Sequence, residues 1–148
     1  MKLIAHRGNV EGRDEVWENT PRHIDNAISM GYDVEVDVWE SVESIWLGHD
    51  RPTYSIRMDF LLERAEHLWI HAKNITAVEV LKSYPELNWF WHDKDDMTLT
   101  SKNIPWCYEG VYVEGGITVE LGEPKEIPNK ILGVCTDTPS LYERIQYV

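Results

Sequence analysis

The chain has 148 residues, a hydrophobic content of 43% and a net charge of −12. These values are typical of a globular domain with its own core, so we expect residues 1–148 to form a single domain. The negative charge argues against nucleic acids and anionic membrane surfaces as partners, because both would repel the protein. No apolar run approaches the roughly 20 residues that a membrane-spanning helix needs. The first strand begins at the N-terminus and leaves no space for a signal peptide, which predicts a cytoplasmic protein.

The first predicted elements are a short strand and a helix. Residues 2–5 are apolar and form the strand. Asn19 or Thr20 can cap the helix, whose first turn contains Pro21 at a position where a missing N–H does no harm. Apolar residues then recur at helical spacing as far as Gly31, which ends the helix.

A hairpin is predicted next. Residues 33–39 alternate Val with Asp and Glu, which is the period of a strand that uses both of its faces. A tight turn at 41–44 leads into a second strand at 45–48. Because no helix separates the two strands, we expect them to pair with each other.

Helices and strands alternate in the middle of the chain, and the pattern then loosens into short strands. Helices are predicted at 58–66, 76–83 and 139–146, and strands at 68–72, 89–92, 98–100, 104–108, 117–121 and 131–135. Two cysteines, Cys107 and Cys135, lie in apolar segments and lack the CxxC spacing of a thiolate metal site. We therefore expect buried free thiols.

This succession of strands, several of them followed by helices, predicts an α/β fold of the (β/α)8 or TIM-barrel type. A full barrel of this type has about 250 residues. The chain is shorter, so we expect a reduced barrel with shortened or missing outer helices. Missing helices would leave apolar barrel surface exposed, and a homodimer is one way to cover that surface.

Charged residues in the first third of the chain indicate a catalytic site. Glu35 and Asp37 lie two apart on a predicted strand, so their side chains point to one face. Two acids inside a barrel are costly unless a cation neutralises them, whereas a solvated strand face is the alternative. His6 and His49 lie at the ends of predicted strands, where such barrels present catalytic groups. Together these residues point to metal-assisted cleavage of a phosphate ester.

Four motifs resemble the pattern of the glycerophosphodiester phosphodiesterase family, whose barrel also underlies the phosphatidylinositol-specific phospholipases C. They are His6-Arg7-Gly8, Glu18-Asn19-Thr20, Glu35-Val36-Asp37 and Gly48-His49-Asp50, in the order and spacing of the family. The match covers residues 2–52 and continues less completely through 68–73. The resemblance implies a phosphoric diester hydrolase of lipid metabolism with a barrel fold.

The resemblance also implies catalytic and phosphate-binding residues. His6 and His49 would act as the general acid and base, since the pKa of histidine lies near working pH. Arg7 would hold the phosphate through paired hydrogen bonds, and Lys73 would add a second positive charge. The alternatives are structural histidines for the first pair, a surface ion pair for Arg7 and an ordinary strand-end lysine for Lys73.

The metal ligands that the resemblance implies include one departure from the family. Glu35 and Asp37 would bind one divalent cation, and His71 stands where the family has a third carboxylate ligand. Glu18 would either bind the same ion or orient Arg7. Two carboxylates and an imidazole suit Mg²⁺, Mn²⁺ or Zn²⁺ better than Ca²⁺. We expect Mg²⁺, with Mn²⁺, Ca²⁺ and Zn²⁺ as the alternatives.

Further residues are candidates for the pocket wall. His92 ends a predicted strand on the catalytic face, although it could instead cap a turn with Asp93. Trp91 and Trp106 are candidates for an aromatic wall, although large aromatic side chains more often belong to a core. Glu120, on a later predicted strand, is a weaker candidate of the same kind.

The predicted function is a metal-dependent phosphodiesterase that hydrolyses a glycerophosphodiester or a related small soluble phosphodiester by His/His acid-base catalysis. The alternative is a catalytically idle reduced barrel that binds a phosphorylated ligand or a protein partner. The short chain and the histidine at position 71 motivate that alternative. A third reading is a metal-dependent hydrolase of a different ester.

Overall fold

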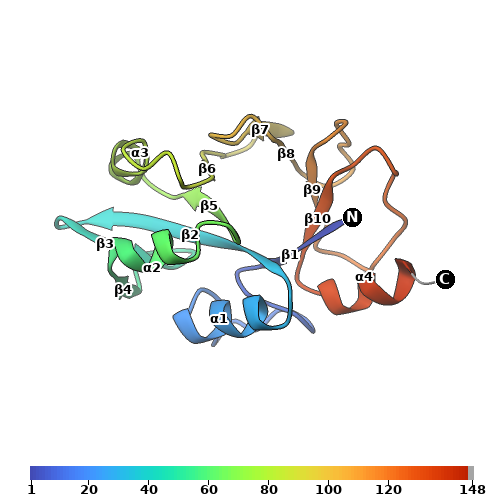
Figure 1. The fold of residues 1–148 in the computed structure, drawn as a ribbon, viewed down its shortest axis with the longest axis horizontal. Helices are drawn as coiled ribbons and strands as arrows, with labels where there is room; N and C mark the ends of the chain where they lie inside the picture. The colour runs from blue at the N-terminus through green and yellow to red at the C-terminus, as the bar shows by residue number, and fades with distance from the viewer. Residues whose placement is uncertain (147–148) are drawn as a thin grey trace.

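The structure, a computed structural model, describes residues 1–146 as a curled half-barrel with a mixed ten-stranded sheet and four short helices (Figure 1). The strands are β1 (Lys2–His6), β2 (Asp33–Ser41), β3 (Ser44–Leu47), β4 (Tyr54–Ile56), β5 (Leu68–Ala72), β6 (Trp89–Phe90), β7 (Met97–Leu99), β8 (Pro105–Cys107), β9 (Ile117–Val119) and β10 (Gly133–Thr136). The helices are α1 (Pro21–Ser29), α2 (Met58–Glu63), α3 (Ile75–Leu81) and α4 (Pro139–Gln146).

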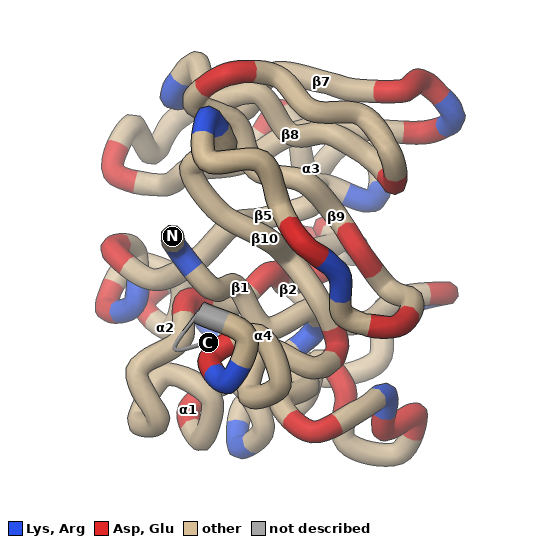
Figure 2. Tube along the Cα trace, turned by 90° about the vertical axis from the view of Figure 1, so that its right-hand side faces the viewer, with Lys and Arg blue, Asp and Glu red and all other residues tan. Residues whose placement is uncertain are grey.

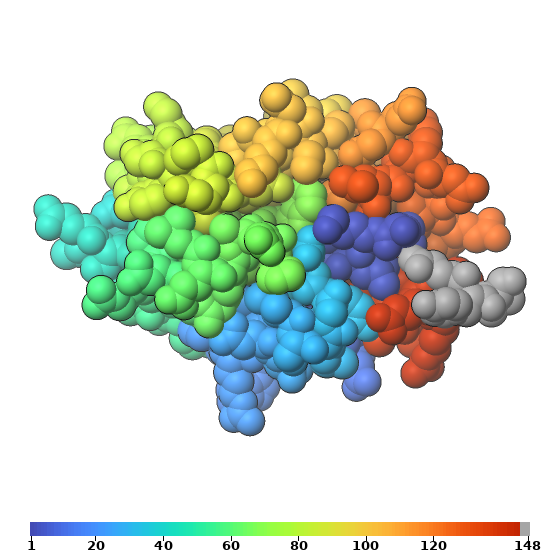
Figure 3. All heavy atoms as spheres, in the orientation of Figure 1, coloured from blue at the N-terminus to red at the C-terminus, as the bar shows by residue number. Residues whose placement is uncertain are grey.

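Parallel strands form the body of the sheet, in the order β6-β5-β2-β1-β10-β9-β8. Strands β3 and β4 extend β2 as an antiparallel meander, and β7 pairs antiparallel with β8. The first and last strands are neighbours, with Lys2 opposite Gly133. The first and last strands therefore lie side by side at the centre of the sheet, and N-terminal residues pack against C-terminal ones (Figure 3).

The predicted (β/α)8 TIM-type barrel is wrong. Helices follow only β1, β4, β5 and β10, and the connections between β6 and β10 are turns and irregular loops. These connections do not supply an outer helical layer around that half of the sheet. Within residues 1–146 no strand pairing joins β6 to β8, so the sheet curls without closing. The same part of the chain holds no helix with the length and apolar content needed to cross a bilayer.

Several local predictions are confirmed. The strand at Leu68–Ala72 and the helix at Pro139–Gln146 have the predicted bounds. Strands β2 and β3 form the predicted hairpin. Of the two candidate caps, Thr20 is the one used, because its side chain accepts a hydrogen bond from the backbone N–H of His23. Strand β4 was not predicted, because three residues are too few to show a period of two.

Alternation along the strands produces two separate cores. On β5, Leu68 and Ile70 belong to a cluster that also includes apolar residues of α1, α2 and α3. Trp69 points to the opposite face and packs in a second cluster with Phe90 and Trp106. This second cluster lies inside the curl of the sheet and forms the floor beneath the polar residues described below. The cysteines are free and buried, as predicted.

The turn of the β2–β3 hairpin contains unfavourable residues for its backbone. Val42 and Glu43 have φ values of 53° and 59°, the left-handed pair that this tight turn requires. A β-branched residue is strained there, and Val42 is 88% exposed, so its side chain contributes little packing. We expect the double variant Val42→Asn/Glu43→Gly to raise the free energy of unfolding by about 1 kcal/mol. Urea denaturation checks this, and an unchanged or lower value would contradict it.

Candidate functional site

The candidate site lies at the carboxyl ends of the parallel strands, inside the curl of the sheet. A cavity of about 620 Å³ opens there. It is lined by the predicted residues His6, Arg7, Glu35, Asp37, His49, His71, Lys73, His92 and Trp106. These residues come from six strands, β1, β2, β3, β5, β6 and β8, or from the segments that follow them. All of these strands except β3 are parallel, and their shared polarity brings the residues to one end of the sheet. His49 reaches the same place through the antiparallel hairpin of β2 and β3.

Glu35 and Asp37 are almost completely buried, with 3% and 1% of their surfaces exposed. Together with His71 they offer ligand atoms that all lie within 4.8 Å of one another. Burial and the charge of Asp37 raise the pKa of Glu35, and one of its oxygens, Oε2, has no hydrogen-bond partner. A buried carboxylate with an oxygen that has no hydrogen-bond partner, close to two other possible ligands, fits a bound cation.

Asp37 is held by a set of polar contacts. Its Oδ2 accepts a hydrogen bond from Asn19 Nδ2 at 2.9 Å and lies 3.3 Å from Arg7 Nε. Its backbone N–H donates to Asn19 Oδ1. Burial alone would raise the pKa of Asp37, but hydrogen bonds with His49 and His71 and the charge of Arg7 lower it well below its usual range. Asp37 is therefore an ionised anchor, whereas the charge of Glu35 costs free energy.

Asn19 has a different position from the one that its sequence context suggested. Thr20 caps the helix, and Asn19 is buried against Asp37 with a left-handed φ of 62°. Residues in this conformation cost free energy and persist where surrounding contacts hold them. Asn19 thus belongs to the site.

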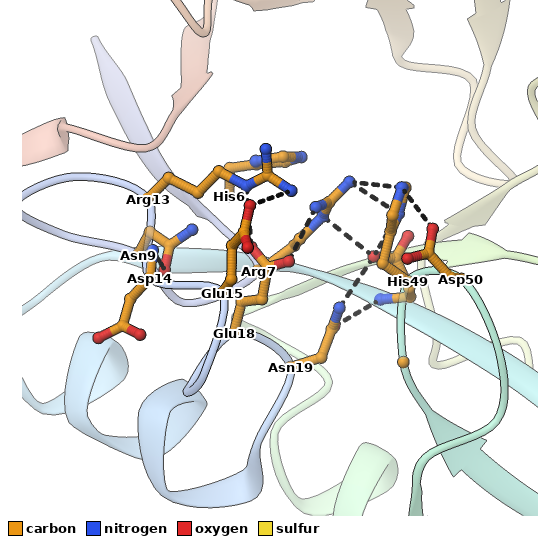
Figure 4. A network of polar contacts seen from close by, with 12 residues as sticks. His6, Arg7, Asn9, Arg13, Asp14, Glu15, Glu18, Asn19, His49 and Asp50 are labelled. Atoms are coloured by element: carbon orange, nitrogen blue, oxygen red, sulfur yellow. Dashed lines mark hydrogen bonds and ion pairs between the residues drawn. The ribbon is translucent and has the colours of Figure 1, made fainter.

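Arg7 lies at the centre of a polar network (Figure 4). Its Nη1 donates to Glu18 Oε1 at 3.1 Å, and its Nη2 lies 2.7 Å from His49 Nδ1. Like Asn19, Arg7 has a positive φ, of 56°. Glu18 does not line the cavity and contacts Arg7, which matches the orienting alternative for this residue better than metal binding.

His6 is oriented by a carboxylate that the sequence analysis missed. Its Nδ1 lies 2.8 Å from Asp137 Oδ1, which also accepts a hydrogen bond from Asn9. The Nε2 of His6 lies 3.7 Å from Glu35 Oε2. Burial lowers the pKa of His6, but the hydrogen bond to Asp137 and the charge of Glu35 outweigh it, so the pKa is raised. The signal for Asp137 was its place directly after the apolar strand β10.

His49 is positioned by the loop that follows β3. Gly48 has a φ of 155°, and a Cβ added there would collide with the carbonyl oxygen of Arg51. Trp39 Nε1 donates a hydrogen bond to the carbonyl oxygen of Gly48 at 2.6 Å. The backbone at Gly48, directly before His49, is therefore fixed by Trp39 and by the close approach of Arg51.

These constraints lead to a prediction for Gly48→Ala. The new methyl group cannot fit without moving the backbone at Arg51, so the loop must shift and carry His49 away from Arg7. We expect any reaction catalysed at this site to slow by about 10²-fold or more. The matched control is Gly110→Ala, a left-handed glycine with open space around it. Equal turnover of the two variants would contradict the prediction.

The opposite wall of the cavity is aromatic. Phe90 stacks on Trp106 with ring centroids 4.6 Å apart, and His92 stacks on Tyr108 at 3.7 Å. Tyr108 also lines the cavity and was not predicted. These rings give the polar cavity an apolar side.

Two predicted pocket residues do not line the cavity. Trp91 is 45% exposed at the surface. Glu120 is buried, pairs with Lys125 at 2.7 Å and accepts a hydrogen bond from the hydroxyl of Tyr112. Its charge is thus satisfied within the loops around β9.

Comparison of the chain with protein-family models, with curated proteins and with solved structures finds no match. The chemistry of the site therefore follows from its own residues and their geometry.

Proposed function

We propose that this protein is a metal-dependent phosphodiesterase that hydrolyses a glycerophosphodiester or a related small phosphodiester. One observation carries the proposal: two histidines, an arginine, a lysine and the Glu35–Asp37–His71 group line a single cavity. Proton transfer, anion binding and cation binding are the three needs of this reaction. The motif resemblance to glycerophosphodiester phosphodiesterases supports the choice of substrate class.

Glu35, Asp37 and His71 would hold one divalent cation. The unpartnered Oε2 of Glu35 and the short separation of the three donors support this assignment. When bound, such an ion supplies positive charge against a non-bridging phosphate oxygen. Without it, Glu35 would keep a costly buried charge.

Arg7 and Lys73 would bind the phosphate. Arg7 is held in place by Glu18 and Asp37, so little entropy is lost when it meets an anion. Lys73 follows β5 directly and lines the same cavity. A guanidinium held by two carboxylates, with an ammonium lining the same cavity, suits an anion that spreads its charge over several oxygens.

His6 and His49 would move the protons. One imidazole takes the proton from the attacking hydroxyl as the new phosphorus–oxygen bond forms. The other gives a proton to the leaving alcohol as the old bond breaks. Asp137 would keep the ring of His6 in one orientation, as the 2.8 Å contact to Nδ1 supports.

The aromatic wall and the surface charge support a small substrate. The wall of Phe90, Trp106 and Tyr108 would accommodate an apolar part of the esterified group. Acidic segments are spread over the face that carries β9, β10 and α4 (Figure 2), and the net charge is −12. Docking on an anionic bilayer would be repelled by this charge.

The test is turnover by the purified full chain. Glycerophosphocholine and bis-p-nitrophenyl phosphate serve as substrates, each with Mg²⁺, Mn²⁺, Ca²⁺ or Zn²⁺ and with a chelator control. We expect metal-dependent hydrolysis that is lost in His49→Ala and kept in His67→Ala, a histidine outside the cavity. No turnover with any ion, from folded protein that binds one, would refute the proposal.

A further inference from the structure

We propose that His71 binds the metal ion through Nδ1 and makes the site selective for an imidazole-binding transition-metal ion of the Zn²⁺ type over Mg²⁺ and Ca²⁺. The inference rests on the proposed metal site but not on the reaction assigned to it. It replaces the Mg²⁺ expected from the sequence with an ion chosen by the donor set.

The imidazole ring of His71 is held in one orientation. His71 Nε2 lies 3.2 Å from the carbonyl oxygen of His92, which can only accept a hydrogen bond. Nε2 therefore carries a hydrogen. The ring also stacks on Phe90, with centroids 4.9 Å apart and planes 24° apart, which restricts its rotation. A hydrogen bond from the far ring nitrogen is the usual device that orients a metal-binding histidine.

The other ring nitrogen of His71 faces a carboxylate oxygen. Nδ1 lies 3.4 Å from Asp37 Oδ1. Because Nε2 faces the carbonyl oxygen of His92, Nδ1 is the ring nitrogen placed to offer a lone pair to a cation. Glu35 also offers a carboxylate oxygen, and the ligand atoms of the three residues lie within 4.8 Å of one another, a spacing that suits one shared cation.

The two carboxylate oxygens of Asp37 have different partners. Oδ2 is occupied by Asn19 and faces Arg7, whereas Oδ1 faces His71. Asp37 therefore contacts the polar network of Arg7 through Oδ2. Its Oδ1 remains available to bind a cation together with Nδ1 of His71 and an oxygen of Glu35.

The charge and chemical type of the three ligand groups also favour one class of ion. The group offers two carboxylates and one neutral nitrogen, and Arg7 beside Asp37 offsets part of the negative charge. Mg²⁺ and Ca²⁺ bind mainly oxygen donors, so an imidazole in place of a third carboxylate gains them less than it gains Zn²⁺. Zn²⁺ and its neighbours gain from an imidazole ligand. The donor set therefore favours a transition-metal ion.

The experiment measures binding of the metal alone, without substrate. The chelator-treated full chain is titrated with Zn²⁺, Co²⁺, Mg²⁺ and Ca²⁺, using a competing chromophoric chelator for the tight ions. We expect His71→Glu to weaken Zn²⁺ binding by about 10-fold or more and to strengthen Mg²⁺ and Ca²⁺ binding. His67→Gln, which changes a histidine just before β5, is expected to leave all four affinities unchanged. The change in the Zn²⁺/Mg²⁺ ratio is decisive, since many sites bind Zn²⁺ more tightly than Mg²⁺.

A second measurement needs no variant and decides the matter if His71→Glu fails to fold. ¹⁵N NMR of the Zn²⁺-loaded wild-type protein is expected to show His71 with a hydrogen on Nε2 and the metal on Nδ1. A protonated His71 ring in the loaded protein, or an unchanged Zn²⁺/Mg²⁺ ratio in His71→Glu, would overturn the inference. Selective Zn²⁺ binding without phosphodiester cleavage would support the inference and refute the proposed function. Turnover with Mg²⁺, together with an unchanged ratio, would do the reverse.

Discussion

The Glu35→Gln variant is expected to lose metal-dependent turnover by about 10³-fold or more, while its metal-free form becomes more stable than the wild type. Burial and the charge of Asp37 raise the pKa of Glu35 in the folded protein. An ionised Glu35 therefore destabilises the fold at pH values above its ordinary pKa. A neutral amide removes this cost, so we expect the metal-free variant to have a higher free energy of unfolding than the wild type at neutral pH. The same amide is a poor metal ligand, so activity and metal-free stability change in opposite directions.

Two measurements check this prediction. Turnover is measured at saturating metal, and urea denaturation is measured with a chelator at several pH values. The stability gain should fade as the pH falls from the raised pKa of Glu35 to the ordinary pKa of glutamate, and it should be absent below that value, because position 35 is then uncharged in both the folded and the unfolded wild type. Addition of metal should stabilise the wild type and leave the variant nearly unchanged. A variant that is both less stable and fully active would contradict the assignment.

A matched control lies on the same strand. Asp33 is the first residue of β2, two positions before Glu35, where it pairs with Lys2 and accepts a hydrogen bond from Trp69 Nε1. Asp33→Asn keeps an oxygen for Trp69 and does not touch the cavity. We expect its turnover per folded molecule to equal that of the wild type.

The second large effect is expected at His6 and its partner. His6→Asn should lower kcat by about 10³-fold, because it removes one of the two groups proposed to transfer a proton. Asp137→Asn should lower kcat by about 10²-fold, because the ring loses its charged partner but keeps a hydrogen-bond acceptor. The hydrogen bond to Asp137 helps to raise the pKa of His6, so this variant should also lower that pKa. Proton NMR of the metal-free protein follows the histidine signal as the pH changes.

Asp96→Asn is the control for this pair, since Asp96 is an exposed residue outside the cavity. It should change neither kcat nor the titration of His6. If Asp137→Asn also leaves both unchanged, Asp137 has no part in positioning His6. A loss of kcat without a change in the pKa would indicate that Asp137 acts on the shape of the cavity rather than on the ring.

Local patterns in the sequence were enough to predict most elements. The alternation in residues 33–39 predicts β2, the apolar run at Leu68–Ala72 predicts β5, and the short connection at 41–44 predicts the hairpin. Each of these depends on residues close together in the chain. The barrel prediction was wrong because closure depends on pairing between distant strands and on helices that the later connections do not form.

For the site, the sequence by itself determined which residue types are present and, through strand period, that Glu35 and Asp37 share a face. Only the tertiary structure decided their partners. Asp137 reaches His6 across 131 positions of sequence because β10 pairs with β1. Asn19 reaches Asp37 because its backbone adopts a left-handed conformation. Thr20 caps the helix, so the side chain of Asn19 is not needed for capping. The physical reason is that strand periodicity depends on residues adjacent in the sequence. The hydrogen bonds and ion pairs of the site join residues that are distant in the sequence and become neighbours only when the strands pair.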